Sequence, residues 1–151
     1  MKVAVLGTGT IGSAVGVALL QSGYDVIAYN RTSGKTEELV KNGATAVIHP
    51  AEAIEKADAV LLTVMDGNAV KELLFSNESR ITLAGKNFLN VATTSSDEIK
   101  EIAKQVGDLG GTMSELAIKT DALAVRERNQ SPLSIPCGSG FQDAVYCSIF
   151  R

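Results

Sequence analysis

The chain of 151 residues is poor in the residue types that mark several protein classes. It has 2 cysteines, 1 histidine, 3 prolines and no tryptophan, and aromatic residues make up 5% of it. Cys137 and Cys147 have no cysteine or histidine at the spacing of zinc ligands, so we expect reduced thiols and no metal site.

The chain also lacks a dense run of charge and a long run of apolar residues. Its formal net charge is −3, and basic residues are spread along it. Nucleic acids are bound mainly through clustered lysine and arginine, so we expect no nucleic-acid partner. Glycines break the apolar run near Met1, and no stretch approaches a membrane span. The expected location is the cytoplasm, without a membrane partner.

What the chain does contain is a regular alternation of strand-like and helix-like segments. Apolar runs predict strands, and segments with helical periodicity or capping residues lie between them. The predicted strands are 3–6, 25–29, 44–48, 59–64, 87–92, 112–116 and 133–137, and the later predicted helices are 50–56, 66–75, 96–106 and 119–129. This order predicts an α/β fold with a doubly wound, mostly parallel sheet of the Rossmann type, formed by 1–151 as one domain. A flavodoxin-like or other α/β domain is the alternative.

A glycine-rich turn follows the first predicted strand and opens the first predicted helix. Gly7, Gly9 and Gly12 have the spacing G-x-G-x-x-G, which allows a tight turn, a close approach of the backbone to a pyrophosphate, and close packing of the helix on the strand. The helix amides then face the phosphates. We expect a dinucleotide to bind along this turn, at Gly7, Thr8, Gly9, Thr10, Ile11 and Gly12.

The end of the second predicted strand indicates which dinucleotide is preferred. Asn30 stands where NAD sites commonly carry Asp or Glu. Arg31 can offer a planar fork to a 2′-phosphate, while Thr32, Ser33 and Lys35 add hydroxyls and positive charge. The prediction is NADP(H) in preference to NAD(H). The alternative is a solvated basic turn that caps the next helix, for which Ser33 is the candidate N-cap.

Four stretches in order resemble the N-terminal domain of the β-hydroxyacid dehydrogenase superfamily, which includes 3-hydroxyisobutyrate and 6-phosphogluconate dehydrogenases, glyoxylate reductases and imine reductases. They are VLGTGTIGSAVGVALLQSGYDVIAYNRT, ADAVLLTVMDGNAVKELLF, NFLNVATTSSDEIKEIAKQVGDLGG and LSIPCGSGFQDA. The resemblance implies cofactor contacts beyond the glycine turn. Those residues are Thr63, Val64, Met65, Val70, Asn90 and Thr93.

The resemblance also suggests residues near the reacting end of the cofactor. Thr94 could donate its hydroxyl to the carboxamide or to the substrate, and the ammonium of Lys119 could polarise a carbonyl or donate a proton. The alternatives are that the threonines only form a turn and cap before the helix, and that Lys119 is a solvated lysine at a helix start.

The sequence departs from the family pattern in two places. Hydroxyacid dehydrogenases carry a Ser-Gly-Gly segment where this chain has Lys119-Thr120-Asp121, which favours an imine-reductase-like branch. Relatives also continue into a helical domain for substrate binding and dimerisation, and nothing matches it before Arg151. Without that domain, the apolar surface that it covers in relatives would be exposed, which would favour a homo-oligomer.

The expected function is that of an NADPH-dependent oxidoreductase, represented by its cofactor domain. It would transfer hydride between NADP(H) and a small carbonyl compound, hydroxyacid or imine, so its partners are a cofactor and a small-molecule substrate. A non-catalytic NADP-binding module, or a truncated product that needs a partner chain, is one alternative. A deazaflavin-dependent NADP reductase is another.

Overall fold

The computed structural model describes residues 1–76 and 83–116, and in these the strands and helices alternate as predicted. The strands are β1 (Lys2–Leu6), β2 (Asp25–Tyr29), β3 (Thr45–Val47), β4 (Ala59–Leu62), β5 (Asn87–Asn90) and β6 (Thr112–Glu115). The helices are α1 (Thr10–Gln21), α2 (Glu37–Lys41), α3 (Pro50–Lys56), α4 (Gly67–Phe75) and α6 (Ser96–Asp108).

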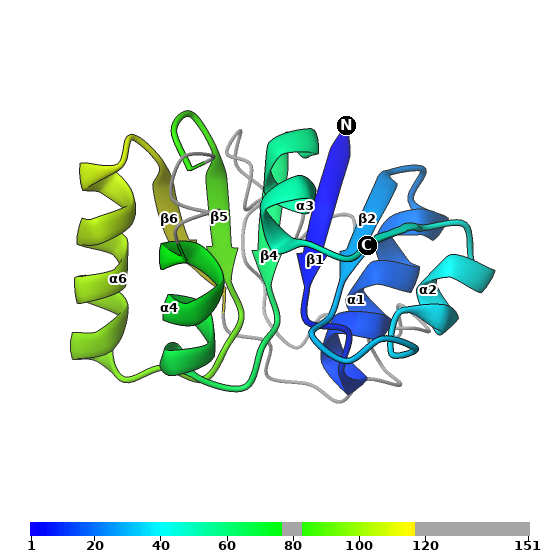
Figure 1. The fold of residues 1–151 in the computed structure, drawn as a ribbon, viewed down its shortest axis with the longest axis horizontal. Coiled ribbons are helices and arrows are strands. Elements are labelled where there is room, and N and C mark those ends of the chain that lie inside the picture. Colours follow the sequence, from blue (N-terminus) through cyan, green and yellow to red (C-terminus); the bar gives the residue numbers. More distant parts are fainter. Residues whose placement is uncertain (77–82, 117–151) are drawn as a thin grey trace, which may run out of the picture.

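The strands form one six-stranded sheet with the order β3-β2-β1-β4-β5-β6, and every pairing is parallel (Figure 1). The chain moves outward from β1 to β3, then returns to the other side of β1 and moves outward again to β6. This order confirms the doubly wound Rossmann-type sheet. Ligands of such sheets bind at the carboxyl ends of the strands where the order reverses, which is between β1 and β4 here.

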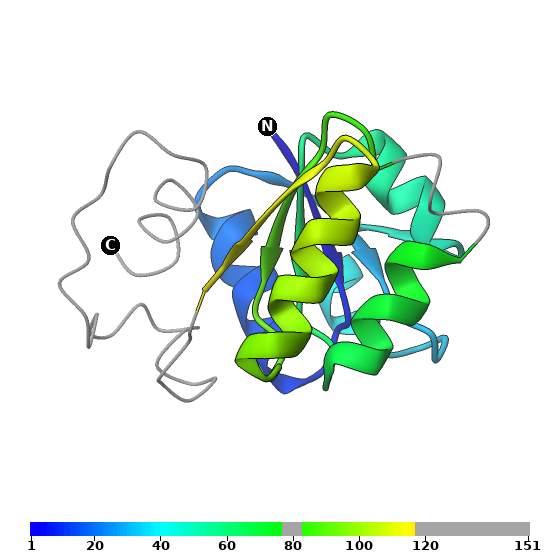
Figure 2. The same cartoon turned by 90° about the vertical axis from the view of Figure 1, so that its left-hand side faces the viewer.

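Helices cover both faces of the sheet, and side chains of β1 point alternately to the two layers. Val3 and Val5 pack with α1 and α2 on one face, while Ala4 and Leu6 pack with α3, α4 and α6 on the other. Figure 2 shows α1 on one side of the strands and α3, α4 and α6 on the opposite side. Because both faces are covered, the central strands are almost wholly apolar.

The second predicted helix starts later than the sequence suggested. Ser33 was predicted as its cap, but the helix begins at Glu37 after Thr36. Gly34 has a φ of 90°. This left-handed conformation cannot belong to a right-handed helix, so residues 33–36 form turns instead. The prediction that Ser33 caps this helix is therefore wrong.

Several predicted strands are shorter at their carboxyl ends. The fourth ends at Leu62 and the fifth at Asn90, before the predicted limits of 64 and 92. The chain leaves the sheet there to form the edge that holds the candidate site. The predicted helix 119–129 and strand 133–137 lie outside the described residues.

Candidate dinucleotide site

A cleft of about 720 Å³ opens at the carboxyl ends of β1, β2 and β4, on the switch point of the sheet. Its lining comes from the turn after β1, the end of β2 and the turn after it, the start of α3, the loop after β4 and one face of α4. The residues are Gly7, Gly9, Tyr29, Asn30, Arg31, Thr32, Lys35, Pro50, Thr63, Val64, Met65, Asp66, Asn68, Ala69, Glu72, Leu73 and Ser76.

The three glycines of the turn have different reasons to lack a side chain. Gly7 has a φ of 102°, and a Cβ there would lie 2.8 Å from the carbonyl oxygen of Thr63. A Cβ on Gly12 would collide with the carbonyl oxygen of Gly7 and lie 2.7 Å from the Thr63 hydroxyl. Both glycines are explained by packing within the chain.

Gly9 has no such internal reason. It has an ordinary φ of −73°, and a Cβ there would meet nothing within 4 Å. Gly9 is the N-cap of α1 but supplies no side-chain hydrogen bond, and the first turn of α1 has no acidic residue. Since Gly9 also lines the cleft, its missing side chain leaves the positive end of α1 open to an anion.

Hydrogen bonds from neighbouring segments hold the glycine turn in place. The Thr8 amide donates to Oδ1 of Asn30 at 3.1 Å, and the Thr8 hydroxyl donates to the Lys35 carbonyl at 2.7 Å. From the other side, the Thr63 hydroxyl donates to the Gly7 carbonyl at 2.6 Å. The turn is therefore braced from both the β2 and the β4 sides.

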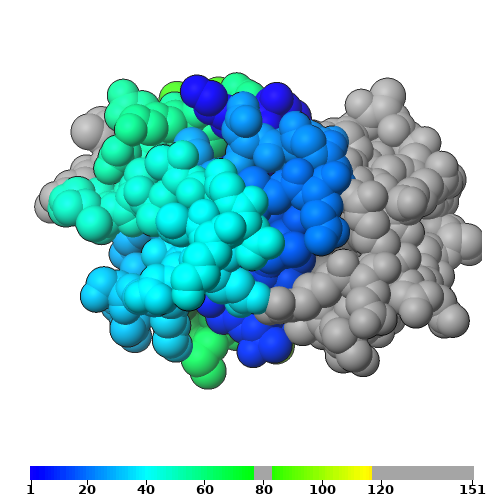
Figure 3. All heavy atoms as spheres, turned by 90° about the vertical axis from the view of Figure 1, so that its right-hand side faces the viewer, coloured from blue at the N-terminus to red at the C-terminus, as the bar shows by residue number. Residues whose placement is uncertain are grey.

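The turn after β2 brings positive charge to one end of the cleft. Asn30 is occupied by the brace, because its amide also donates to the Thr32 carbonyl at 3.2 Å. Arg31, Thr32 and Lys35 are exposed and line the cleft. Figure 3 shows this side of the molecule, where the blue surface of α1 borders the cyan surface of α2 and the segment after it. Ser33, the remaining contact predicted in this turn, does not line the cleft.

The loop after β4 lies at the other end of the cleft. Thr63 and Val64 are half-buried, whereas the side chain of Met65 is 86% exposed. Asp66 forms an isolated parallel bridge with Thr93, and its carboxylate caps α4 by accepting from the Ala69 amide at 2.9 Å. The segments after β4 and β5 therefore lie side by side at this end.

Other predicted contacts are placed beside or beneath the cleft. Val70 belongs to α4 and is fully buried in the core. Asn90 is also fully buried, and its amide donates to the Ala92 carbonyl at 3.3 Å and to the Thr94 hydroxyl at 3.2 Å. Because a carbonyl can only accept, this bond fixes the orientation of the Asn90 amide, whose oxygen has no partner among the described residues. Thr93 is exposed and Thr94 half-buried.

Sequence reasoning missed the contribution of α4 to the cleft. Asn68, Ala69, Glu72, Leu73 and Ser76 recur at helical spacing and share one face, so helical periodicity applied to this segment could have found them. Tyr29 and Pro50 were also missed. Lys119 lies outside the described residues, together with the rest of the departure at 119–121.

The helix that follows β5 has a closed N-terminus, in contrast to α1. Ser95 caps α6, with its hydroxyl accepting from the Glu98 amide at 3.3 Å, and Oε2 of Glu98 accepts from the Ser95 amide at 3.1 Å. The backbone amide and then the hydroxyl of Ser95 lower the pKa of Glu98 from its ordinary value. This pair is a reciprocal capping box.

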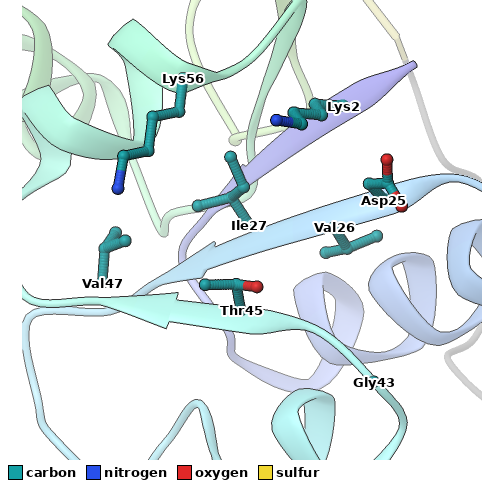
Figure 4. Close-up of a pocket in the computed structure, with 8 residues that line it drawn as sticks. All are labelled: Lys2, Asp25, Val26, Ile27, Gly43, Thr45, Val47 and Lys56. Carbon is teal, nitrogen blue, oxygen red and sulfur yellow. The ribbon is translucent and has the colours of Figure 1, made fainter.

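A second, smaller hollow of about 370 Å³ lies away from the glycine turn. Ile27 and Val47 project from β2 and β3 on the side of α3, which carries Lys56, and Lys2 comes from β1 (Figure 4). The described residues contain neither a candidate metal site nor a candidate membrane span. In this part of the chain no group of three or more His, Cys, Asp or Glu could hold a metal ion. No helix among these residues is long and apolar enough to cross a membrane.

The sheet order, the switch-point cleft and the open glycine turn together define a dinucleotide-binding domain of the kind found in oxidoreductases. The chain belongs to the family described as the NAD binding domain of 6-phosphogluconate dehydrogenase, whose model matches residues 2–120. The resemblance derived from the sequence is thus confirmed at the level of the family.

Several known proteins similar to this chain are oxidoreductases by name, and others are cytokine-like nuclear factors N-PAC. It is 35% identical over 102 residues to the uncharacterized oxidoreductase YfjR of Bacillus subtilis, covering 67% of this chain and 36% of that protein. It is 30% identical over 117 residues to glyoxylate/succinic semialdehyde reductase 1 of Arabidopsis thaliana, covering 76% of this chain and 40% of that protein. An imine reductase from Myxococcus stipitatus, solved in complex with NADP+, matches with a TM-score of 0.80 and 29% identity, covering 83% of this chain and 43% of that chain. The chain therefore spans less than half the length of these relatives.

Proposed function

We propose that this chain binds NADP(H) in preference to NAD(H) and forms the cofactor domain of an oxidoreductase. The reaction would be hydride transfer between the nicotinamide and a small carbonyl compound, hydroxyacid or imine. The cofactor supplies the hydride, and the protein contributes binding, orientation and electrostatics. The observation that carries the proposal is Gly9, whose position leaves the N-terminus of α1 open inside the cleft.

The glycine turn would hold the pyrophosphate. A negatively charged group at this place would face the first amides of α1 and the positive end of its dipole. The braces from Asn30 and Thr63 keep the turn in one geometry, so little ordering is needed on binding. These features support dinucleotide binding of either kind.

The turn after β2 would read the adenosine ribose. The end of β2 presents no carboxylate to the cleft, since Asn30 stands there and is tied to the Thr8 amide. Arg31 and Lys35 are exposed cations at the same end. An arginine fork matches a phosphate monoester, whereas ribose hydroxyls are commonly bound by Asp or Glu. This charge pattern supports the preference for NADP(H).

The nicotinamide would lie toward the loop after β4. Met65 is a large exposed apolar side chain there, and Thr93 and Thr94 follow the neighbouring strand β5. We assign the cofactor contacts to the glycine turn, to Asn30, Arg31, Thr32 and Lys35, and to Thr63–Met65. Roles for Thr94 and Lys119 near the substrate, the cytoplasmic location and a homo-oligomer stay predictions.

The proposal is tested by titrating the protein with NADPH and with NADH, followed by the fluorescence of the reduced nicotinamide. Saturable binding with tighter binding of NADPH is the expected result. If a folded protein binds neither dinucleotide, the proposal fails.

Arg31→Ala tests the basis of the preference. Loss of charged hydrogen bonds to the 2′-phosphate should weaken NADPH binding about 10- to 100-fold, with a much smaller effect on NADH. Lys41→Ala is the matched control, because Lys41 is an exposed cation of α2 that does not line the cleft. An equal loss for NADPH and NADH in Arg31→Ala would show that Arg31 does not read the phosphate.

A further inference from the structure

One ion pair spans the cleft at its cationic end. Nη1 of Arg31, in the turn after β2, lies 3.7 Å from Oε2 of Glu72 in α4. Both residues line the cleft, and their side chains are 88% and 73% exposed. The cation expected to read a phosphate is therefore already paired with a carboxylate from the opposite wall.

Glu72 is set apart from the other acidic residue of the cleft. Among the described lining residues the acids are Asp66 and Glu72, and the Asp66 carboxylate is occupied in capping α4. The preceding residue, Lys71, extends toward α6 and pairs with Glu101 at 3.1 Å. Neighbouring charges on α4 thus serve different purposes, and the Glu72 charge is the one that faces Arg31.

We infer that Glu72 is a specificity-determining residue that competes with the 2′-phosphate for Arg31 and so lowers the preference for NADPH over NADH. This inference rests on the proposed function. A bound 2′-phosphate adds a charge of about −1.5 to −2 at neutral pH. To bind it, Arg31 must leave Glu72, and the carboxylate then stays near the phosphate as a like charge. NADH brings no such group to this end of the cleft.

The size of the effect follows from the exposure of the pair. Exposed ion pairs are weak and are screened by salt, so the competition should be modest and strongest at low ionic strength. The competition should change the ratio of the NADPH affinity to the NADH affinity, and it should change the NADH affinity itself only slightly. A purely structural role of Glu72 would change both affinities alike.

The test compares Glu72→Gln with Glu101→Gln by equilibrium titration with NADPH and NADH at low and high salt. Glu72→Gln should tighten NADPH binding about three- to fivefold at low salt, with less than about 1.5-fold change for NADH. Glu101→Gln removes the same charge from the Lys71–Glu101 pair between α4 and α6, outside the cleft, and should leave the ratio unchanged. Thermal unfolding checks that both variants are folded.

The same substitution in an Arg31→Ala background tests the competition itself. There the gain from Glu72→Gln should be clearly smaller, because no cation is left to compete for. Weaker NADPH binding in Glu72→Gln would overturn the inference, since Glu72 would then orient Arg31. So would equal changes for NADPH and NADH, or an undiminished gain without Arg31. If the unsubstituted protein binds neither dinucleotide, it is the proposed function that fails.

Discussion

The helices α1 and α6 start at the same edge of the sheet, each just after a central strand, yet their N-termini are built in opposite ways. Ser95 and Glu98 close the start of α6 with reciprocal hydrogen bonds. At the start of α1, Gly9 provides no side chain, and the first turn has no acid. A helix start satisfied by its own side chains needs nothing further, whereas an open one in a cleft is suited to an external anion.

Closing the start of α1 should give the largest effect on binding. Gly9→Asp would place a carboxylate where the pyrophosphate is proposed to lie, and like-charge repulsion at about 4 Å predicts roughly a hundredfold loss of NADPH and NADH affinity. The fold should tolerate the change, because a Cβ at Gly9 has open space and an Asp can cap the helix.

Gly107→Asp is the control for charge, since Gly107 of α6 also has open space around a Cβ and does not line the cleft. It should leave both affinities unchanged in the same titration. If Gly9→Asp binds NADPH as tightly as the unsubstituted protein, the open helix start is not the phosphate site.

Crowding the α1 turn from inside should instead damage the fold. Gly12→Ala forces a methyl group onto the Gly7 carbonyl oxygen, for an expected loss of about 1–3 kcal/mol in the free energy of unfolding. Urea denaturation measures it. Gly107→Ala, where no atom opposes the new methyl group, should stabilise the protein by up to about 1 kcal/mol. Equal stability of the two variants would contradict the packing argument.

Opening the start of α6 should have a smaller effect, on stability alone. Ser95→Ala removes the N-cap hydroxyl and should lower the free energy of unfolding by about 1 kcal/mol. Dinucleotide affinity should stay unchanged, because Ser95 does not line the cleft. Paired urea denaturation and NADPH titration would show whether the two helix starts separate stability from binding in this way.

Acidification should reveal the smallest effect. The pKa of Glu98 is lowered in the folded state, chiefly by its bonds to the Ser95 amide and hydroxyl. Its contribution is therefore present above the ordinary pKa of the group and is lost as the pH falls through the lower folded-state value. The stability difference between the unsubstituted protein and Glu98→Ala should shrink from neutral pH to about pH 3. A difference that grows on acidification would contradict the assignment.

Features that depend on neighbouring residues in the sequence could be predicted, whereas features that depend on the folded arrangement could not. Apolar runs and the Gly7-Gly9-Gly12 spacing are local signals, so they located the strands, the sheet type and the glycine turn before α1. The Ser33 cap failed because the positive φ of Gly34 depends on how the turn after β2 reaches its helix. Glycine adopts positive and negative φ values with similar ease, so the sequence alone does not show which of the two Gly34 takes.

Long-range pairs could not be predicted in this way. The contact of Arg31 with Glu72 joins segments 41 positions apart and exists only because α4 lies across the switch point from the β2 turn. The double use of Asn30 was also invisible. The residue type of Asn30 suggested an uncharged ribose site. Its side-chain oxygen accepts from the Thr8 amide, and this bond forms because the ends of β1 and β2 lie side by side in the sheet.

Different side chains hold the glycine turn in place and present positive charge to the cleft. Thr8, Asn30 and Thr63 hold the turn, while Arg31 and Lys35 stay exposed toward the cleft. Lys35 contributes to the brace only through its backbone carbonyl, which any residue provides. The residues proposed to set the cofactor preference, at positions 31, 35 and 72, can therefore be changed without removing any of the side-chain hydrogen bonds that hold the glycine turn. A lineage on this scaffold could exchange one nicotinamide cofactor for the other through surface charges alone.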